Sequence, residues 1–168
     1  MARQRAQQVN WIAVYYREAG ASVELTEEQI AAGAGPDPAP ARAFLNALPL
    51  SPRAGLRATI AAVRDRPPPS FPTGSQAWRL MHKPAKKGEV DMSGIFEARD
   101  RHARKLYRLF CVLDSRAPEH GLAAPALVML SGTVKNVGEE VPQAVYREVR
   151  RQADRYFATS PRPVISLG

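Results

Sequence analysis

Cysteine is nearly absent from this chain: Cys111 is the only one among 168 residues. A single thiol can form neither an internal disulfide nor a cysteine-based zinc site, which excludes disulfide-stapled secreted domains and the zinc-finger classes. The thiol lies inside an apolar run, Leu106 to Leu113, and suits a reducing compartment. We therefore expect a cytoplasmic protein.

Long hydrophobic runs are missing as well. No apolar stretch approaches the ~20 residues that a helix needs to cross a bilayer. The basic residues 1–8 are followed by no apolar segment of the kind that secretion signals carry. We expect neither membrane association nor a secretion signal. Clusters of Asp, Glu or His at metal-ligand spacing are also missing, so no metal or other cofactor is implied.

Acidic residues are few relative to basic ones. Lys+Arg number 24 and Asp+Glu 16, which gives a formal net charge of +8. Such an excess attracts polyanions: nucleic acid, an anionic membrane surface or an acidic protein. Because no membrane-seeking helix accompanies the charge, it favours nucleic acid or an acidic partner, although many small basic proteins are merely soluble.

The first half of the chain predicts a strand and two helices. The segment Val9 to Tyr16 is β-branched and aromatic, which is typical of a strand. Residues 20–40 are rich in turn formers and predict a surface excursion. Apolar residues at helical spacing then predict a helix from Pro40 to Leu48 and a second that begins at Ser51 as N-cap. The three prolines at 67–69 end this second helix.

The second half predicts a sheet and a closing helix. Four segments have the composition or alternation of strands: 78–82, 95–101, 106–113 and 126–130. Residues 142–157 predict a C-terminal helix. We expect one α+β domain over residues 1–158, with an N-terminal strand, a helical hairpin, an antiparallel sheet of three to four further strands and a C-terminal helix. Its helices should cover one sheet face and leave the other open, and residues 159–168 should form a loose tail.

Positive charge gathers around one expected β-hairpin. The candidate nucleic-acid-binding residues are Arg99, Arg101, Arg104, Lys105 and, upstream, Lys83, Lys86 and Lys87. Arg108 differs from these because it lies within an apolar strand, where a guanidinium is costly unless it reaches water or an anion. We interpret Arg108 as an anion-binding residue. The alternative is an ion pair with Glu97 across the sheet.

Three short motifs and the last helix resemble the RelE/ParE toxin superfamily, nearest to its HigB-like branch, which includes phage-derived toxins. The motifs are G-I-F-E-A-R at 94–99, L-Y-R-L-F at 106–110 and L-S-G-T-V-K-N at 130–136, and the helix ends R-R-Q-A-D-R-Y at 150–156. The order of elements fits over residues 9–156, whereas the specific motifs lie only in the second half.

The sequence departs from the family pattern in two ways. Asn136 stands where the family has a second lysine, so that the basic pair of the family pattern is reduced to Lys135. Insertions at 20–38, 67–76 and 114–123 could alter docking or give a partner something to hold.

The resemblance implies a cytoplasmic type II toxin that enters the ribosomal A site and cleaves mRNA, and that is held inactive by an antitoxin, often one with a helix-turn-helix domain. It implies that Arg108 holds the scissile phosphate and that Arg99 and Arg101 grip flanking phosphates. Lys135 matches the basic position after the fourth strand. Tyr146 falls where some members keep a functional tyrosine, which orients or protonates.

Metal-independent RNA cleavage by 2′-OH attack needs charge stabilised at phosphorus and a proton delivered to the leaving oxygen. Arginine and lysine suit the first task, and His102, near the hairpin turn, is a candidate for a titrating group. Simpler interpretations remain for three residues: His102 as a turn residue, Tyr146 as helix packing and Lys135 as a solvated strand end. We interpret His82 and His120 as structural or incidental.

Two other functions stay open. A ParE-like inhibitor would share the fold, bind DNA gyrase and cut nothing, and a non-toxic domain on the same scaffold would only bind RNA or protein. The cations around a strand arginine favour the endonuclease, because a gyrase binder has less need of them.

Overall fold

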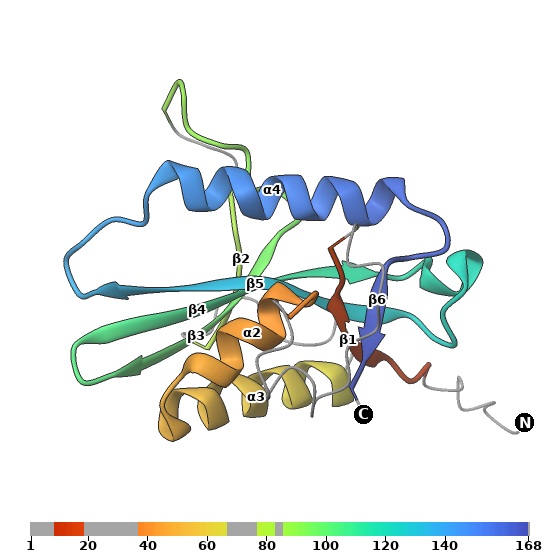
Figure 1. Ribbon diagram of the computed structural model, residues 1–168, viewed down its shortest axis with the longest axis horizontal. Helices are drawn as coiled ribbons and strands as arrows, with labels where there is room; N and C mark the ends of the chain where they lie inside the picture. Colours follow the sequence, from red (N-terminus) through yellow and green to blue (C-terminus); the bar gives the residue numbers. More distant parts are fainter. Residues whose placement is uncertain (1–8, 19–36, 67–76, 83–85, 168) are drawn as a thin grey trace, which may run out of the picture.

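The computed structural model describes residues 9–18, 37–66, 77–82 and 86–167 (Figure 1). Lys83, the expected insertion at 67–76 and residues 20–36 of the expected insertion at 20–38 lie outside the described residues. The elements in chain order are β1 (Ile12–Tyr16), α2 (Pro40–Ala47), α3 (Leu50–Asp65), β2 (Trp78–Leu80), β3 (Phe96–His102), β4 (Lys105–Asp114), the 3-10 helix η1 (Ala117–His120), β5 (Ala126–Asn136), α4 (Gln143–Ala158) and β6 (Val164–Ser166).

The strands form one six-stranded mixed sheet in the order β2-β3-β4-β5-β1-β6. β1 pairs with β5 in parallel, and every other neighbouring pair is antiparallel. The expected α+β class is confirmed, as is the antiparallel arrangement of β2 to β5. Within the described part of the chain, no helix combines the length and the apolar character needed to span a lipid bilayer.

Helices cover both faces of the sheet, so the expectation of one open face is wrong. Helices α2 and α3 pack on one face, where their side chains form a core with alternate residues of β1, β4 and β5. Helix α4 packs on the other face through Val149, Ala153 and Tyr156. Figure 1 shows α4 on the opposite side of the sheet from α2 and α3. The physical reason is that the central strands are apolar on both faces: four of the five residues of β1 are buried.

β5 is longer than its apolar pattern predicts. The expected strand ends at Leu130, whereas the observed strand continues to Asn136 because β4 supplies pairing partners from Asp114 back to Lys105. Gly132, in this extension, lies against the ring of Phe44 in α2. A Cβ at this position would stand 2.2 Å from that ring, so only glycine permits this approach of the helix.

The chain end is part of the sheet, which corrects the expectation of a loose tail at 159–168. β6 pairs with β1, and Arg162 anchors the segment before it. The buried Arg162 Nε lies 3.1 Å from Asp114 Oδ2, and Arg162 Nη1 donates to the carbonyls of Phe157 and Thr159 at 2.7 and 3.1 Å. The hydroxyl of Tyr156 also donates to Asp114, at 2.8 Å. This buried cluster fastens the end of α4 to the sheet.

Candidate functional site

The strand register brings four arginines to the sheet face that α4 covers. Arg99 of β3 stands directly opposite Arg108 of β4, and Glu97 stands opposite Arg79 of β2. Arg101 lies two residues beyond Arg99, and alternate residues of a strand point to the same face. The expected alternation, with Glu97, Arg99 and Arg101 on one side of β3, agrees with this register.

Glu97 is the buried carboxylate at the centre of this group. Its side chain is 1% exposed, and its two oxygens lie 3.4 Å from Arg108 Nη1 and 3.6 Å from Arg99 Nε. The pairing of Arg108 with Glu97, the alternative left open by the sequence, is therefore present. Both distances exceed the 2.7–2.9 Å of a strong charge-assisted hydrogen bond. Within the described residues, Arg108 Nε and Glu97 Oε2 are buried without a hydrogen-bond partner.

Tyr146 places a phenol on the same guanidinium. Arg108 Nη1 donates to the Tyr146 hydroxyl over 3.4 Å, and the tyrosine ring meets Phe110 edge-on with centroids 6.0 Å apart. Burial raises the pKa of Tyr146, and the Arg108 charge partly opposes that shift. The phenol therefore keeps its proton at neutral pH. Because its oxygen accepts from Arg108, its own O–H group can donate to another acceptor.

A pocket of about 320 Å³ opens where these residues meet. It lies between β2, β3, β4, the segment 89–92 and the start of α4, and Val90 N fastens that segment to α4 by donating to Gln143 Oε1 at 3.0 Å. The volume is at the lower end of small-ligand pockets. The polar and charged groups that line it include Arg79, His82, Glu89, Glu97, Arg108 and Tyr146.

Arg79 and His82 are among the lining residues that sequence reasoning missed. His82 was interpreted as structural or incidental, yet it lines the pocket together with Arg108 and Tyr146. His82 follows Arg79 by three residues. The register of β2 with β3 places Arg79 opposite Glu97, and local sequence does not show this pairing. His120 has a different setting, because its Nδ1 lies 2.9 Å from Ser160 Oγ in the segment after α4.

His102 is not part of the pocket. It pairs with Lys105 at the end of the β3–β4 ladder, three positions from the Arg99–Arg108 pair, or about 10 Å along the strand. By strand alternation it also points to the face opposite Arg108. Between His102 and Lys105, the residues Ala103 and Arg104 have positive φ angles of 49° and 62° and form a tight hairpin turn.

The remaining predicted residues lie around the pocket rather than in it. Lys135 pairs with Leu106, two positions from the point on β5 opposite Arg108, and its ammonium donates to the carbonyl of Glu139. This contact agrees with a solvated strand end. Lys86 and Lys87 are exposed in the turn just before Glu89, which lines the pocket.

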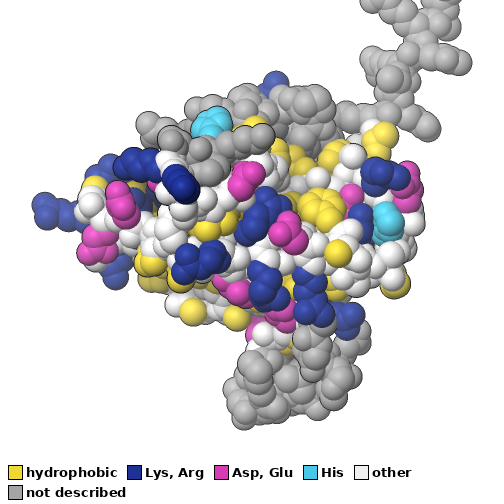
Figure 2. Space-filling model, turned by 90° about the horizontal axis from the view of Figure 1, so that it is seen from above, with side chains coloured by type: hydrophobic (Ala, Val, Ile, Leu, Met, Phe, Trp, Pro, Cys, Tyr) yellow, Lys and Arg dark blue, Asp and Glu magenta, His cyan; other side chains and the backbone are white. Residues whose placement is uncertain are grey.

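Cations spread over this face of the molecule. Seen from the side of α4, lysine and arginine side chains extend across the surface with acidic side chains between them (Figure 2). Arg99 and Arg101, together with Asp100, also border a wider hollow of about 560 Å³. In the part of the chain that is described, no group of three His, Cys, Asp or Glu side chains is arranged to hold a metal ion.

Comparisons with protein-family models, with curated proteins and with solved structures found no match. The chemistry of the site thus follows from its own geometry. Around the buried carboxylate of Glu97 the sheet gathers Arg79, Arg99 and Arg108, and Glu89 adds a second carboxylate to the lining of the pocket. A protonated phenol and an imidazole line the same pocket. Such a site can bind a phosphate and exchange protons with it.

Proposed function

We propose that this protein is a toxin of the RelE/ParE type that cleaves mRNA on the ribosome without a metal and so inhibits translation. The observation that carries the proposal is the meeting of Arg108 with the Tyr146 hydroxyl in a pocket that Arg79 and His82 also line. Phosphate recognition and proton transfer are then available at one place, on a surface with an excess of positive charge.

Arg108 supplies charge stabilisation in this proposal. RNA cleavage by 2′-OH attack concentrates negative charge on the phosphate oxygens as the new O–P bond forms. Arg108 contacts that phosphate from the pocket, and Arg99 and Arg101 continue the row of cations toward the hairpin and bind neighbouring phosphates. Glu97 is a positioning residue, because its side chain is buried and contacts Arg99 and Arg108.

Two side chains of the pocket each carry out one of the two proton transfers. His82 accepts the proton of the 2′-OH, since an imidazole nitrogen can act as a general base. Tyr146, which burial keeps protonated, donates its proton to the 5′ oxygen as the P–O5′ bond breaks. The products are a 2′,3′-cyclic phosphate and a 5′-OH end. This assignment gives His82 the role that the sequence suggested for His102.

The test is induction in bacterial cells with the matched pair Tyr146→Phe and Tyr107→Phe. Both replacements remove one hydroxyl, but Tyr107 lies on β4 in the core beneath α2 and α3, on the other sheet face. We expect wild type and Tyr107→Phe to stop growth and translation. Tyr146→Phe should lose cleavage by a factor on the order of 10² or more, as measured by primer extension on cellular mRNA.

The other functions give different results in the same cells. Arrest of DNA replication while translation continues would indicate a gyrase inhibitor, and growth without arrest would indicate a domain that only binds RNA or protein. The proposal also includes an antitoxin partner, whose acidic segment would cover the basic face. Co-expression of such a partner should restore growth without changing the level of the toxin.

A further inference from the structure

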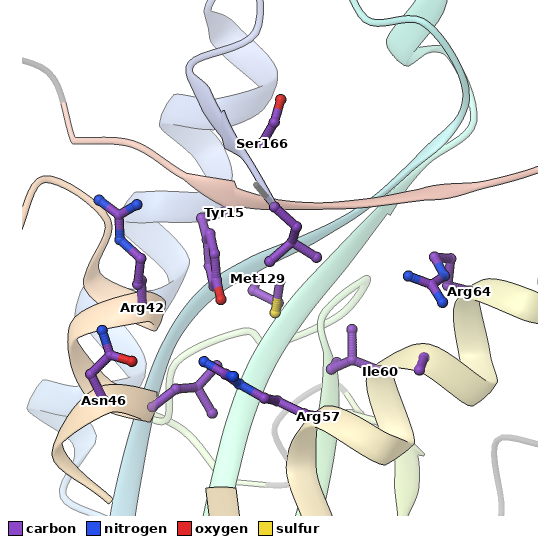
Figure 3. Close-up of a pocket in the computed structure, with 11 residues that line it drawn as sticks. Tyr15, Arg42, Asn46, Arg57, Ile60, Arg64, Met129 and Ser166 are labelled. Atoms are coloured by element: carbon purple, nitrogen blue, oxygen red, sulfur yellow. The ribbon is translucent and has the colours of Figure 1, made fainter. Parts of the chain in front are cut away.

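A second pocket lies on the opposite face of the sheet, between α2 and α3. Its volume is about 300 Å³. Figure 3 shows Arg42 and Asn46 projecting from α2, Arg57 and Arg64 from α3, and Tyr15 of β1 between the two helices. The pocket is separated by the whole sheet from the site around Arg108, so it is independent of the proposed ribonuclease.

The charges of this pocket are positive and only partly neutralised. Three arginines line it, and none of the described residues that line it is acidic. Arg42 makes two bonds of 2.9 Å with Asp37, which is 6% exposed in its side chain. Arg64 pairs with the exposed Asp65, a contact that is weak in water. Among the described residues, Asp37 and Asp65 thus pair with two of the three guanidinium groups that line the pocket.

Of the three arginines that line the pocket, Arg57 is the one whose charge is most available to bind an anion. Its side chain is exposed, and its partner in the pocket is the neutral hydroxyl of Tyr15. A guanidinium carries five N–H donors in a planar fork that matches two oxygens of a carboxylate or phosphate. One hydroxyl oxygen uses little of this capacity.

The rest of the pocket is apolar with a small polar rim. Tyr15, Leu45, Ile60 and Met129 supply apolar surface, and the ring of Tyr15 also lies 5.9 Å from the Arg42 guanidinium. Asn46 of α2 and Ser166 of β6 add neutral hydrogen-bonding groups. A ligand that fits this surface has an apolar, planar body and a charged end.

We propose that this pocket binds a small organic anion, a phosphate monoester or carboxylate on a planar apolar body, with its charged end on Arg57 and Arg64. The volume of about 300 Å³ holds one such molecule rather than an extended chain. Phosphate and carboxylate share the chemistry that the arginines recognise. Because β1, β6, α2 and α3 all contribute to the pocket, the bound anion stabilises the packing of these elements against one another.

The experiment measures the melting temperature and the affinity of the full chain with four probes: phenyl phosphate, benzoate, phenol and inorganic phosphate. A ligand that binds only the folded state raises the melting temperature. We expect a rise with phenyl phosphate, benzoate or both, and none with phenol, which lacks the charge. A rise with phenyl phosphate alone assigns the site to phosphate esters, and one with benzoate alone assigns it to carboxylates.

Charge-matched variants decide whether the anion sits in the pocket. Arg57→Gln should weaken binding about tenfold, the loss expected for one charged hydrogen-bonding group. Arg147→Gln removes the same charge from the exposed surface of α4, beyond the sheet, and should leave binding unchanged. If Arg57→Gln fails to fold, as judged by circular dichroism, Arg64→Gln makes the same comparison.

Three results would overturn the inference. The first is that none of the anions changes the melting temperature at millimolar concentration. The second is that Arg147→Gln weakens binding as much as Arg57→Gln, which means that the ligand responds to net charge. The third is that a tetraglutamate peptide binds more tightly than phenyl phosphate and benzoate, which makes this face a protein-docking surface.

Discussion

Arg99 and Arg108 stand directly opposite each other on neighbouring strands, and both guanidinium groups reach the single carboxylate of Glu97. Like charges in that position repel, so the buried carboxylate is required to hold the two arginines side by side. A buried ion pair that only stabilised the fold would need one arginine for this carboxylate. In the proposed function, the second arginine binds a phosphate.

Glu97→Gln tests this relationship through stability. Removing the carboxylate leaves Arg108 buried beside Arg99 without a counter-charge, and we expect the free energy of unfolding to fall by about 3 kcal/mol. Urea denaturation at pH 7 measures it. Glu119→Gln is the control, since it breaks the exposed pair with Arg116 and should change stability little. If both variants lower the free energy of unfolding equally, the buried Glu97 cluster contributes no more to stability than an exposed ion pair does.

The assignment of proton transfer to His82 is tested by comparing His82→Gln with His102→Gln. Both remove one imidazole, but only His82 lines the pocket with Arg108 and Tyr146. We expect His82→Gln to reduce mRNA cleavage by a factor on the order of 10². His102→Gln should cleave normally. The reverse result would mean that the hairpin tip, not the pocket, holds the reacting phosphate.

Alkaline unfolding follows from the buried tyrosines. Burial is the main cause that raises the pKa of Tyr15, Tyr146 and Tyr156, and it raises the pKa of Tyr16 to about 12. A raised pKa in the folded state means that the protonated phenols stabilise the fold. That contribution is complete below about pH 10, the pKa of an unfolded tyrosine, and is lost as pH rises toward 12.

Measurements of phenolate absorbance and of melting temperature from pH 8 to 12 test this expected loss of stability. We expect the melting temperature to fall steadily above pH 10, with most phenolate absorbance appearing only on unfolding. Complete ionisation at about pH 10 in a protein that is still folded would contradict the buried positions of these side chains.

Arg162→Ala should release the C-terminal strand. The replacement removes the cation that pairs with the buried Asp114, which keeps its hydrogen bond from the hydroxyl of Tyr156. It also removes the guanidinium that donates to the last carbonyls of α4. We expect a loss of about 3 to 5 kcal/mol, typical when one partner of a buried pair is removed. Hydrogen exchange should accelerate in β6 and in the β1 amides that pair with it. Unchanged protection there would show that β6 is held by other contacts.

Local patterns in the sequence predict the elements of the fold well. The apolar run around Cys111 gives β4, helical spacing gives α2 to α4, and alternation gives the facing of Glu97 and Arg99. Long-range contacts explain what was missed. β6 is three residues long and depends on Asp114, which is 48 positions from Arg162. The extension of β5 through Gly132 depends on pairing with β4, which no local pattern encodes.

In the site, as in the fold, local patterns in the sequence predict some features and long-range contacts determine the others. Arg108 was detectable because a cation in an apolar strand needs a reason, whereas its contact with Tyr146 depends on how α4 packs on the sheet. The register placed His102 and Arg108 on opposite faces. It also brought His82 to the pocket from a strand that carries no distinctive motif. Spacing along one segment predicts which face a residue takes, whereas proximity between segments depends on how the strands pair.

Mapping the cleaved ends of mRNA on purified ribosomes tests the central claim most directly. Wild type and Tyr107→Phe should cut ribosome-bound mRNA and leave 5′-OH and 2′,3′-cyclic phosphate ends. Tyr146→Phe and Arg108→Lys should cut at least about a hundredfold more slowly, while their circular dichroism spectra match that of wild type. Intact mRNA with folded wild-type protein, or cleavage by Tyr146→Phe at the wild-type rate, would contradict the account.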